Sequence, residues 1–145
     1  MKKEGLTPDE MSDLLNKKSG VLGISGISSD IREVEAGIEA GDEHAKLAME
    51  MYDYRIKKYV GAYAAAMGGV DIVVFTAGVG EHQWDVRRGA VHGLEFMGIE
   101  LDEEKNRKNC GEEEIISTPA SKVKVVVVPT DEELLIASDT LDLIK

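Results

Sequence analysis

The sequence predicts an α/β fold with parallel strands, from three observations about its apolar residues. Two short apolar runs, 72–75 and 125–128, do not alternate with polar residues, which is typical of strands buried in a sheet. Helical patterns precede, separate and follow these runs. The segment between them is long enough for the crossover that parallel pairing requires. Because the first third of the chain is helical only, we expect it to continue a larger structure.

Three helices are predicted before the first strand. The first begins with a capping box, since Thr7 precedes Pro8 and lies three residues before Glu10. The glycine-rich stretch 21–30 is expected to be a loop with extended parts.

The next two helices have polar residues at their starts and glycines at their ends. Ser28 or Ser29 is expected to cap the first of them. Asp42 begins the longest helix, whose apolar residues step by three or four over about 25 residues until Gly68. Its tyrosines fit a core stripe better than a stacking platform.

The last third of the chain is predicted to hold two more helices and two strands. We expect a short solvated helix within 99–109, and strands within 114–118 and 122–130. A final helix over 131–144 would be capped by Thr130, with Glu133 completing a capping box.

Composition excludes several classes of function. The chain has 145 residues, 43% hydrophobic and 31% charged, as expected for one globular domain with a core. Its net charge of −11 argues against nucleic acid or an anionic membrane as partner. It has neither an apolar run long enough for an anchor nor a signal peptide, so we expect a cytosolic protein.

The single cysteine, Cys110, cannot form an internal disulfide and is predicted to lie in a surface turn, without a catalytic role.

A glycine-rich segment follows the first predicted strand. Gly78 and Gly80 would allow positive φ angles and leave no side chain in the way of a ligand. A helical pattern resumes at Trp84, so a helix N-terminus would point back at the glycines. This arrangement is typical of a phosphate or nucleotide cradle, but a plain strand-to-helix connection fits the pattern equally well.

Three motifs together resemble one known family. They are GISGISSDIRE (23–33), FTAGVGEH (75–82) and VVVPTDEELLIA (126–137). In this order and spacing they resemble the C-terminal portion of the acetate kinase (acetokinase) family. The resemblance implies a ribonuclease-H-like domain of the acetate and sugar kinase, actin and chaperone ATPase superfamily. The chain would be an incomplete enzyme, since residues 1–145 would form only the second, adenosine-side domain.

The resemblance also implies a nucleotide site for ATP or ADP. Asp30, Ile31 and Arg32 would contact the adenosine, with Ile31 in place of the family's phenylalanine. The nucleotide loop would consist of five consecutive residues: Gly78, Val79, Gly80, Glu81 and His82. His82 and Gln83 stand where the family has asparagine and serine.

Magnesium is the implied metal ion, and Glu132 is the candidate ligand for it. Hard carboxylate oxygens suit Mg²⁺, which takes one or two protein carboxylates and keeps most of its waters. An alternative is that Glu132 only complements the helix dipole.

No catalytic residue is expected in this chain. The family's acetate-positioning aspartate and its phosphoryl-stabilising arginines and histidine belong to the N-terminal portion. Of the five arginines here, we expect all but Arg32 to lie on helices facing solvent or partners.

The expected function is therefore the nucleotide-binding half of an acetate kinase, a phosphotransferase that makes acetyl phosphate and ADP from acetate and ATP. Expected partners are the missing N-terminal portion and further copies in a homo-oligomer. Alternatives are a propionate or butyrate kinase fragment, and a truncated, non-catalytic nucleotide-binding or interaction module.

Overall fold

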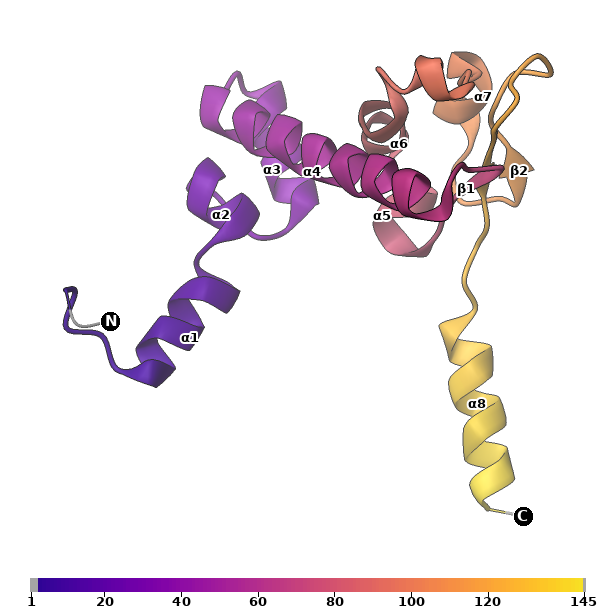
Figure 1. Ribbon diagram of the computed structural model, residues 1–145. Helices are drawn as coiled ribbons and strands as arrows, with labels where there is room; N and C mark the ends of the chain where they lie inside the picture. Colours follow the sequence, from indigo (N-terminus) through magenta and orange to yellow (C-terminus); the bar gives the residue numbers. More distant parts are fainter. Residues whose placement is uncertain (1–2, 145) are drawn as a thin grey trace. The chain divides into compact units, whose positions relative to one another are not determined.

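The computed structural model describes residues 3–144, which form one compact unit up to Ile56 and a second from Lys57 onward (Figure 1). The elements in chain order are α1 (Pro8–Lys17), α2 (Gly20–Ser25), α3 (Ile31–Glu39), α4 (Glu43–Met67), β1 (Ile72–Phe75), α5 (Ala77–His82), α6 (Trp84–Val91), the 3₁₀ turn η1 (Glu95–Met97), α7 (Glu103–Lys108), β2 (Glu114–Ile115), β3 (Lys124–Val127) and α8 (Glu132–Leu143). The α/β class is confirmed. None of the described helices is both long and apolar enough to cross a bilayer.

The start of the first unit is partly as predicted. The capping box of α1 is confirmed, because the Glu10 amide donates to the Thr7 hydroxyl and the Thr7 amide donates to the Glu10 carboxylate. The predicted loop over 21–30 is wrong in its first half, where the chain forms α2. Gly26 ends this helix with a φ of 68°, and its amide donates to the Leu22 carbonyl oxygen at 2.8 Å. Gly26 thus ends a short helix, and Gly23 lies within it without preventing it.

Helix α3 is capped by Asp30, so the prediction of Ser28 or Ser29 as the cap is wrong. The Arg32 amide donates to Asp30 Oδ1 at 3.0 Å, which satisfies one of the free amides of the first turn. Ser28 lies two residues before this cap, and its hydroxyl oxygen accepts a hydrogen bond from the Asp30 amide at 3.1 Å.

Helix α4 has the predicted length of 25 residues, and Gly68 follows it with a φ of 78°. The prediction that its tyrosines form a core stripe is wrong. Tyr59 and Tyr63 are 51% and 63% exposed, and their rings stack on each other at the surface with centroids 6.4 Å apart. The buried residues of this helix are instead small or flexible: Ala45, Ala48, Met49 and Ala64.

The second unit contains a three-stranded sheet with the order β1-β3-β2. Strands β1 and β3 pair in parallel, as predicted, with Phe75 opposite Val127. Strand β2 pairs antiparallel to β3. Burial is complete at Val125 and Val127 of β3, but Ile72 and Val74 of β1 are more than half exposed. The prediction of a fully covered first strand is therefore wrong for β1.

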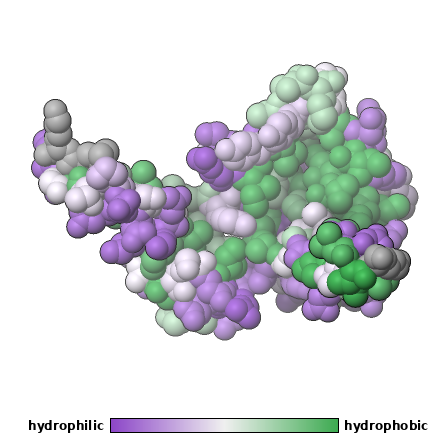
Figure 2. Space-filling model, turned by 90° about the horizontal axis from the view of Figure 1, so that it is seen from below, coloured by the Kyte–Doolittle hydropathy of each residue, from purple (hydrophilic) through white to green (hydrophobic). Residues whose placement is uncertain are grey.

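Apolar side chains remain exposed on several elements, and hydrophobic residues occupy a broad part of the surface in Figure 2. Helix α8 has no buried residue. Its exposed apolar side chains include Leu134, Leu135, Ile136 and Leu141. Surface of this kind marks an interface more often than a free face.

Candidate functional site

The glycine-rich segment forms a helix of its own, α5, directly after β1. Gln83 ends α5 and begins α6, so the first helix N-terminus after the strand is at Ala77 and not at the predicted Trp84. The positive φ angle also lies elsewhere than predicted. It belongs to Ala77 (59°), whereas Gly78 and Gly80 have ordinary helical backbone angles.

Glycine stands at positions 78 and 80 of α5 for different structural reasons. A Cβ atom at Gly80 would lie 3.2 Å from the Phe75 carbonyl carbon, so a side chain there would push α5 away from β1. A Cβ atom at Gly78 would meet nothing within 4 Å. Packing therefore explains Gly80, while Gly78 borders open space that a ligand could enter.

Glu81 ties α5 to the loop before α8. Its Oε1 accepts hydrogen bonds from the amide and the hydroxyl of Thr130, both at 2.9 Å, and the residue is only 8% exposed. These bonds, together with one from the Ala77 amide, hold the pKa of the Glu81 carboxyl below its usual value. The Glu81 side chain is thus engaged within the protein. Thr130 donates to Glu81, and the prediction that it caps α8 is wrong.

His82 packs on the turn that carries Cys110. Its Nδ1 lies 3.2 Å from the Cys110 carbonyl oxygen. A Cβ atom at Gly111 would approach His82 Cε1 to 2.6 Å, so the glycine makes room for the ring. Cys110 itself is exposed, which confirms its predicted surface position.

Arg87 was missed by sequence reasoning. We expected it to face solvent or a partner, but its side chain is completely buried. It lies three and four residues before Ala90 and Val91, on the apolar face of α6, and this spacing is the signal that could have revealed it. Its neighbour Arg88 is exposed and pairs with Glu103 at 3.2 Å, as predicted for a surface arginine.

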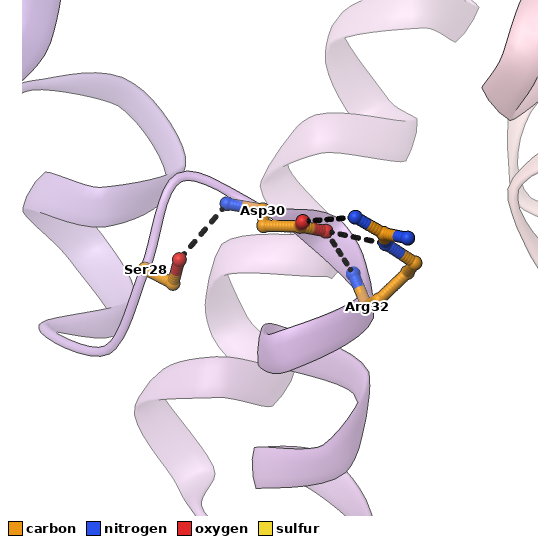
Figure 3. Close-up of polar contacts among 3 residues, drawn as sticks. All are labelled: Ser28, Asp30 and Arg32. Carbon is orange, nitrogen blue, oxygen red and sulfur yellow. Dashed lines mark hydrogen bonds and ion pairs between the residues drawn. The ribbon is translucent and has the colours of Figure 1, made fainter.

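The adenosine candidates lie in the first unit at the start of α3 (Figure 3). Asp30 Oδ2 accepts from Arg32 Nη2 at 2.6 Å, and Asp30 Oδ1 accepts from Arg32 Nε at 3.1 Å. This pair lowers the pKa of the Asp30 carboxyl and raises the pKa of the Arg32 guanidinium. The Arg32 side chain is 81% exposed. Ile31 between them is half-buried.

Glu132 lies exposed in the first turn of α8. The helix cap is Asp131, whose Oδ1 accepts from the Leu134 amide at 2.9 Å, so the predicted capping box of Thr130 and Glu133 is wrong. Within residues 3–144, no three His, Cys, Asp or Glu side chains group closely enough to hold a metal ion. A single carboxylate fits a Mg²⁺ ion that arrives with phosphate oxygens and waters better than a resident ion.

The structure therefore brings Asp30 and Arg32 together in the first unit, and Glu81 of α5 and Thr130 together in the second.

Comparison with known proteins identifies related chains. Residues 1–138 match the model of the Acetokinase family. The chain is 65% identical over 145 residues to an acetate kinase of Bacteroides thetaiotaomicron, covering all of this chain and 36% of that protein. The crystal structure of Porphyromonas gingivalis acetate kinase superposes with a TM-score of 0.91 at 61% identity, covering 100% of this chain and 36% of that one. A propionate kinase structure from Francisella tularensis gives a TM-score of 0.82 at 36% identity, covering 94% and 34%. The chain thus spans little more than a third of the length of these relatives.

Proposed function

The chain belongs to the acetokinase family, and we propose that it is the C-terminal, nucleotide-binding part of an acetate kinase. In the complete enzyme, a phosphoryl group would pass directly between ATP and acetate. Residues 1–145 would form part of a ribonuclease-H-like domain on the adenosine side. Relatives that are 61–65% identical to this chain carry the name acetate kinase, which favours acetate as the acceptor.

The observation that carries this proposal is the open space at Gly78. Neither φ nor packing requires a glycine there, because an added Cβ atom would meet nothing within 4 Å. Gly61 in α4 has equally open surroundings, so what singles out Gly78 is its place near the start of α5, in the segment that resembles the family's nucleotide loop. A missing side chain there would let a ligand approach the backbone closely. Phosphate oxygens are suitable ligands for the free amides of a helix start. The Ala77 amide already donates to the Glu81 carboxylate, so the amides after it are the candidate donors.

The adenosine end of the nucleotide would contact Asp30, Ile31 and Arg32. The exposed guanidinium of Arg32 is held in place by the two hydrogen bonds that it donates to the Asp30 carboxylate, so it is available in a fixed orientation. Ile31 would offer an apolar wall to the base, without the ring stacking that a phenylalanine provides.

Glu132 would hold Mg²⁺ that enters with the nucleotide. The ion would neutralise part of the charge on the phosphate groups when it is bound. Val79, Gly80, Glu81 and His82 would contribute to the site through the backbone of α5, since the carboxylate of Glu81 is engaged with Thr130.

Acetate positioning and transition-state stabilisation would come from the rest of the polypeptide. Phosphoryl transfer depends on positioning and charge stabilisation, so a part that binds only the nucleotide has little catalytic power. The share of 36% that the chain covers in its relatives leaves ample length for those groups.

The proposal is tested by comparing Gly78→Ala with Gly61→Ala. Both glycines lie in helices, neither has a positive φ, and an added Cβ atom would meet nothing within 4 Å at either position. Both variants should melt at or above the temperature of the parent. Only Gly78→Ala should weaken ADP binding, by about tenfold or more, because its methyl group would occupy the space of the phosphate. Equal affinities in calorimetric titrations of the two variants would contradict the proposed role of α5.

A further inference from the structure

We propose that Arg87 is a positioning residue that fixes the backbone of Gly78–Glu81 in its ligand-ready conformation. This inference rests on the function proposed above and assigns Arg87 no contact with the nucleotide.

All five N–H groups of the Arg87 guanidinium are used. Nη1 donates to the carbonyl oxygens of Gly80 (3.0 Å) and Glu81 (2.7 Å). Nε donates to Asn106 Oδ1 (2.8 Å), and Nη2 donates to the carbonyl oxygens of Asn106 (2.7 Å) and Asn109 (3.0 Å). One side of the group therefore holds the last turn of α5, while the other two sides are anchored at α7 and the residue after it.

Each of these five acceptors is neutral. Burying a guanidinium without a hydrogen-bonded carboxylate is unfavourable. Loss of hydration lowers the pKa of Arg87, and the nearby Asp85 charge opposes this shift only in part. The compensating gain is the hydrogen bonding at the end of α5. The carbonyl oxygens of Gly80 and Glu81 lie in the last turn of this helix, where no later amide of the same helix can donate to them. A cation at a helix C-terminus is also favoured by the helix dipole.

Glu81 is held at two points as a result. Its carbonyl oxygen accepts from Arg87, and its carboxylate accepts from Thr130. A helix of six residues is not stable by itself, so its conformation depends on contacts of this kind. Loosening Arg87 should therefore loosen α5 before it loosens the sheet.

The test compares Arg87→Lys with Arg88→Lys in the 145-residue chain. Lysine keeps the charge but offers three donors in place of five, in a different geometry. The neighbouring Arg88 is exposed, so its variant controls for the loss of a guanidinium from α6. Hydrogen exchange at the amides of residues 81–83 and at those of β3 gives the local and global readouts, and ADP titration gives the functional one.

We expect Arg87→Lys to raise the exchange rate of amides 81–83 about tenfold or more, with β3 unchanged, and to weaken ADP binding to a similar degree. Arg88→Lys should alter neither the exchange rates of amides 81–83 nor the ADP affinity. Unchanged exchange at 81–83, or an equal rise in β3, would overturn the inference. If Arg87→Lys does not fold, Asn106→Ala is the second variant. It removes the Nε acceptor together with the hydrogen bond that Asn106 Nδ2 donates to the Trp84 carbonyl oxygen, and it should raise the exchange rates of amides 81–83 several-fold with β3 unchanged. If the parent chain binds no ADP, the proposed function fails, and the exchange data still decide the role of Arg87.

Discussion

At the scale of single residues, Ala77 has a positive φ angle, 59°, at the first position of α5, and no other non-glycine residue between 3 and 144 has one. The left-handed region is unfavourable for an L-residue by roughly 1–2 kcal/mol. Strain of this kind often accompanies functional loops.

Ala77→Gly should therefore raise the free energy of unfolding by up to about 1 kcal/mol, because the relief of strain exceeds the entropy that glycine loses on folding. Ala62→Gly in the exposed interior of α4 is the matched control, and should lower it by about 1 kcal/mol. Urea denaturation measures both changes. A loss of stability in both variants would show that Ala77 carries no strain.

Glu81 makes stability depend on pH in a definite direction. Its pKa is lowered in the folded state, so its contribution is complete above the ordinary glutamate value of 4.5 and is lost as pH falls through the lower, folded value. Glu81→Gln should thus be less stable than the parent at pH 7, and the gap should close progressively below pH 4.5.

Melting temperatures of both proteins between pH 3 and 7 check this prediction, with Glu113→Gln as the control for losing an exposed negative charge. A gap between parent and Glu81→Gln that is constant over the whole pH range would mean that the carboxylate does not hold Thr130.

The candidate site was predictable from sequence to different degrees. The motif residues Gly78 and Gly80 stand out by type and spacing, but sequence reasoning gave both the same explanation, while the structure separates packing at Gly80 from open space at Gly78. Arg87 was misjudged because arginine is seldom fully buried. Its acceptors are mainly carbonyl groups, and no sequence pattern specifies those.

At the scale of secondary-structure elements, Gly37 sets how closely α3 packs within the first unit. A Cβ atom there would lie 2.6 Å from Ile27 Cδ1 and 3.2 Å from the Cβ of Ala45 in α4. Ala45 is fully buried, whereas Ile27 is 41% exposed and its Cδ1 atom can move aside, so the Cβ atom of Ala45 is the fixed obstacle.

Gly37→Ala should therefore destabilise the chain by about 1–3 kcal/mol through overpacking. Gly61→Ala in α4, where an added Cβ atom meets nothing, should stabilise it by up to about 1 kcal/mol. Chemical denaturation of the two variants against the parent gives both values. If Gly37→Ala proved as stable as Gly61→Ala, the close approach of α3 to Ala45 would be wrong.

Capping residues and apolar patterns predicted where most helices and strands occur. They predicted less well where these elements begin and how deeply they are buried. The cap at Thr7 was found because Pro8 and Glu10 stand at the positions of a capping box. Asp42 was predicted to begin the longest helix, and its Oδ1 accepts hydrogen bonds from the amides of His44 and Ala45. The start of α3 was not, since Ser28, Ser29 and Asp30 are all good caps and tertiary packing decides among them. The burial of β1 depends on what lies beside the strand, which the apolar run itself does not specify.

At the scale of the whole molecule, the chain covers 36% of the length of its relatives and exposes apolar residues on β1 and α8. Surface of this extent favours association with the rest of the polypeptide, or self-association in its absence. If the chain carries the nucleotide site proposed above, it should bind nucleotide weakly by itself, because water competes for each contact in an open site.

We expect the purified chain to form no acetyl phosphate from ATP and acetate, since the groups that would orient the acceptor are expected in the remaining polypeptide. Adding the remaining polypeptide as a separate chain should restore some activity, measured by acetate-dependent ADP release. If the chain alone releases ADP in the presence of acetate, and Glu132→Ala abolishes this release, the catalytic groups lie within the chain. No activity after addition would favour the alternative of a non-catalytic binding module.

The central claim, that this chain carries a nucleotide site, is tested most directly by titrating the ¹⁵N-labelled chain with Mg-ADP and following its backbone amide signals. The account predicts shifts concentrated at residues 30–32 and 77–82, with smaller changes at 131–133. Saturation without shifts at 77–82, or no binding at millimolar ADP, would contradict it.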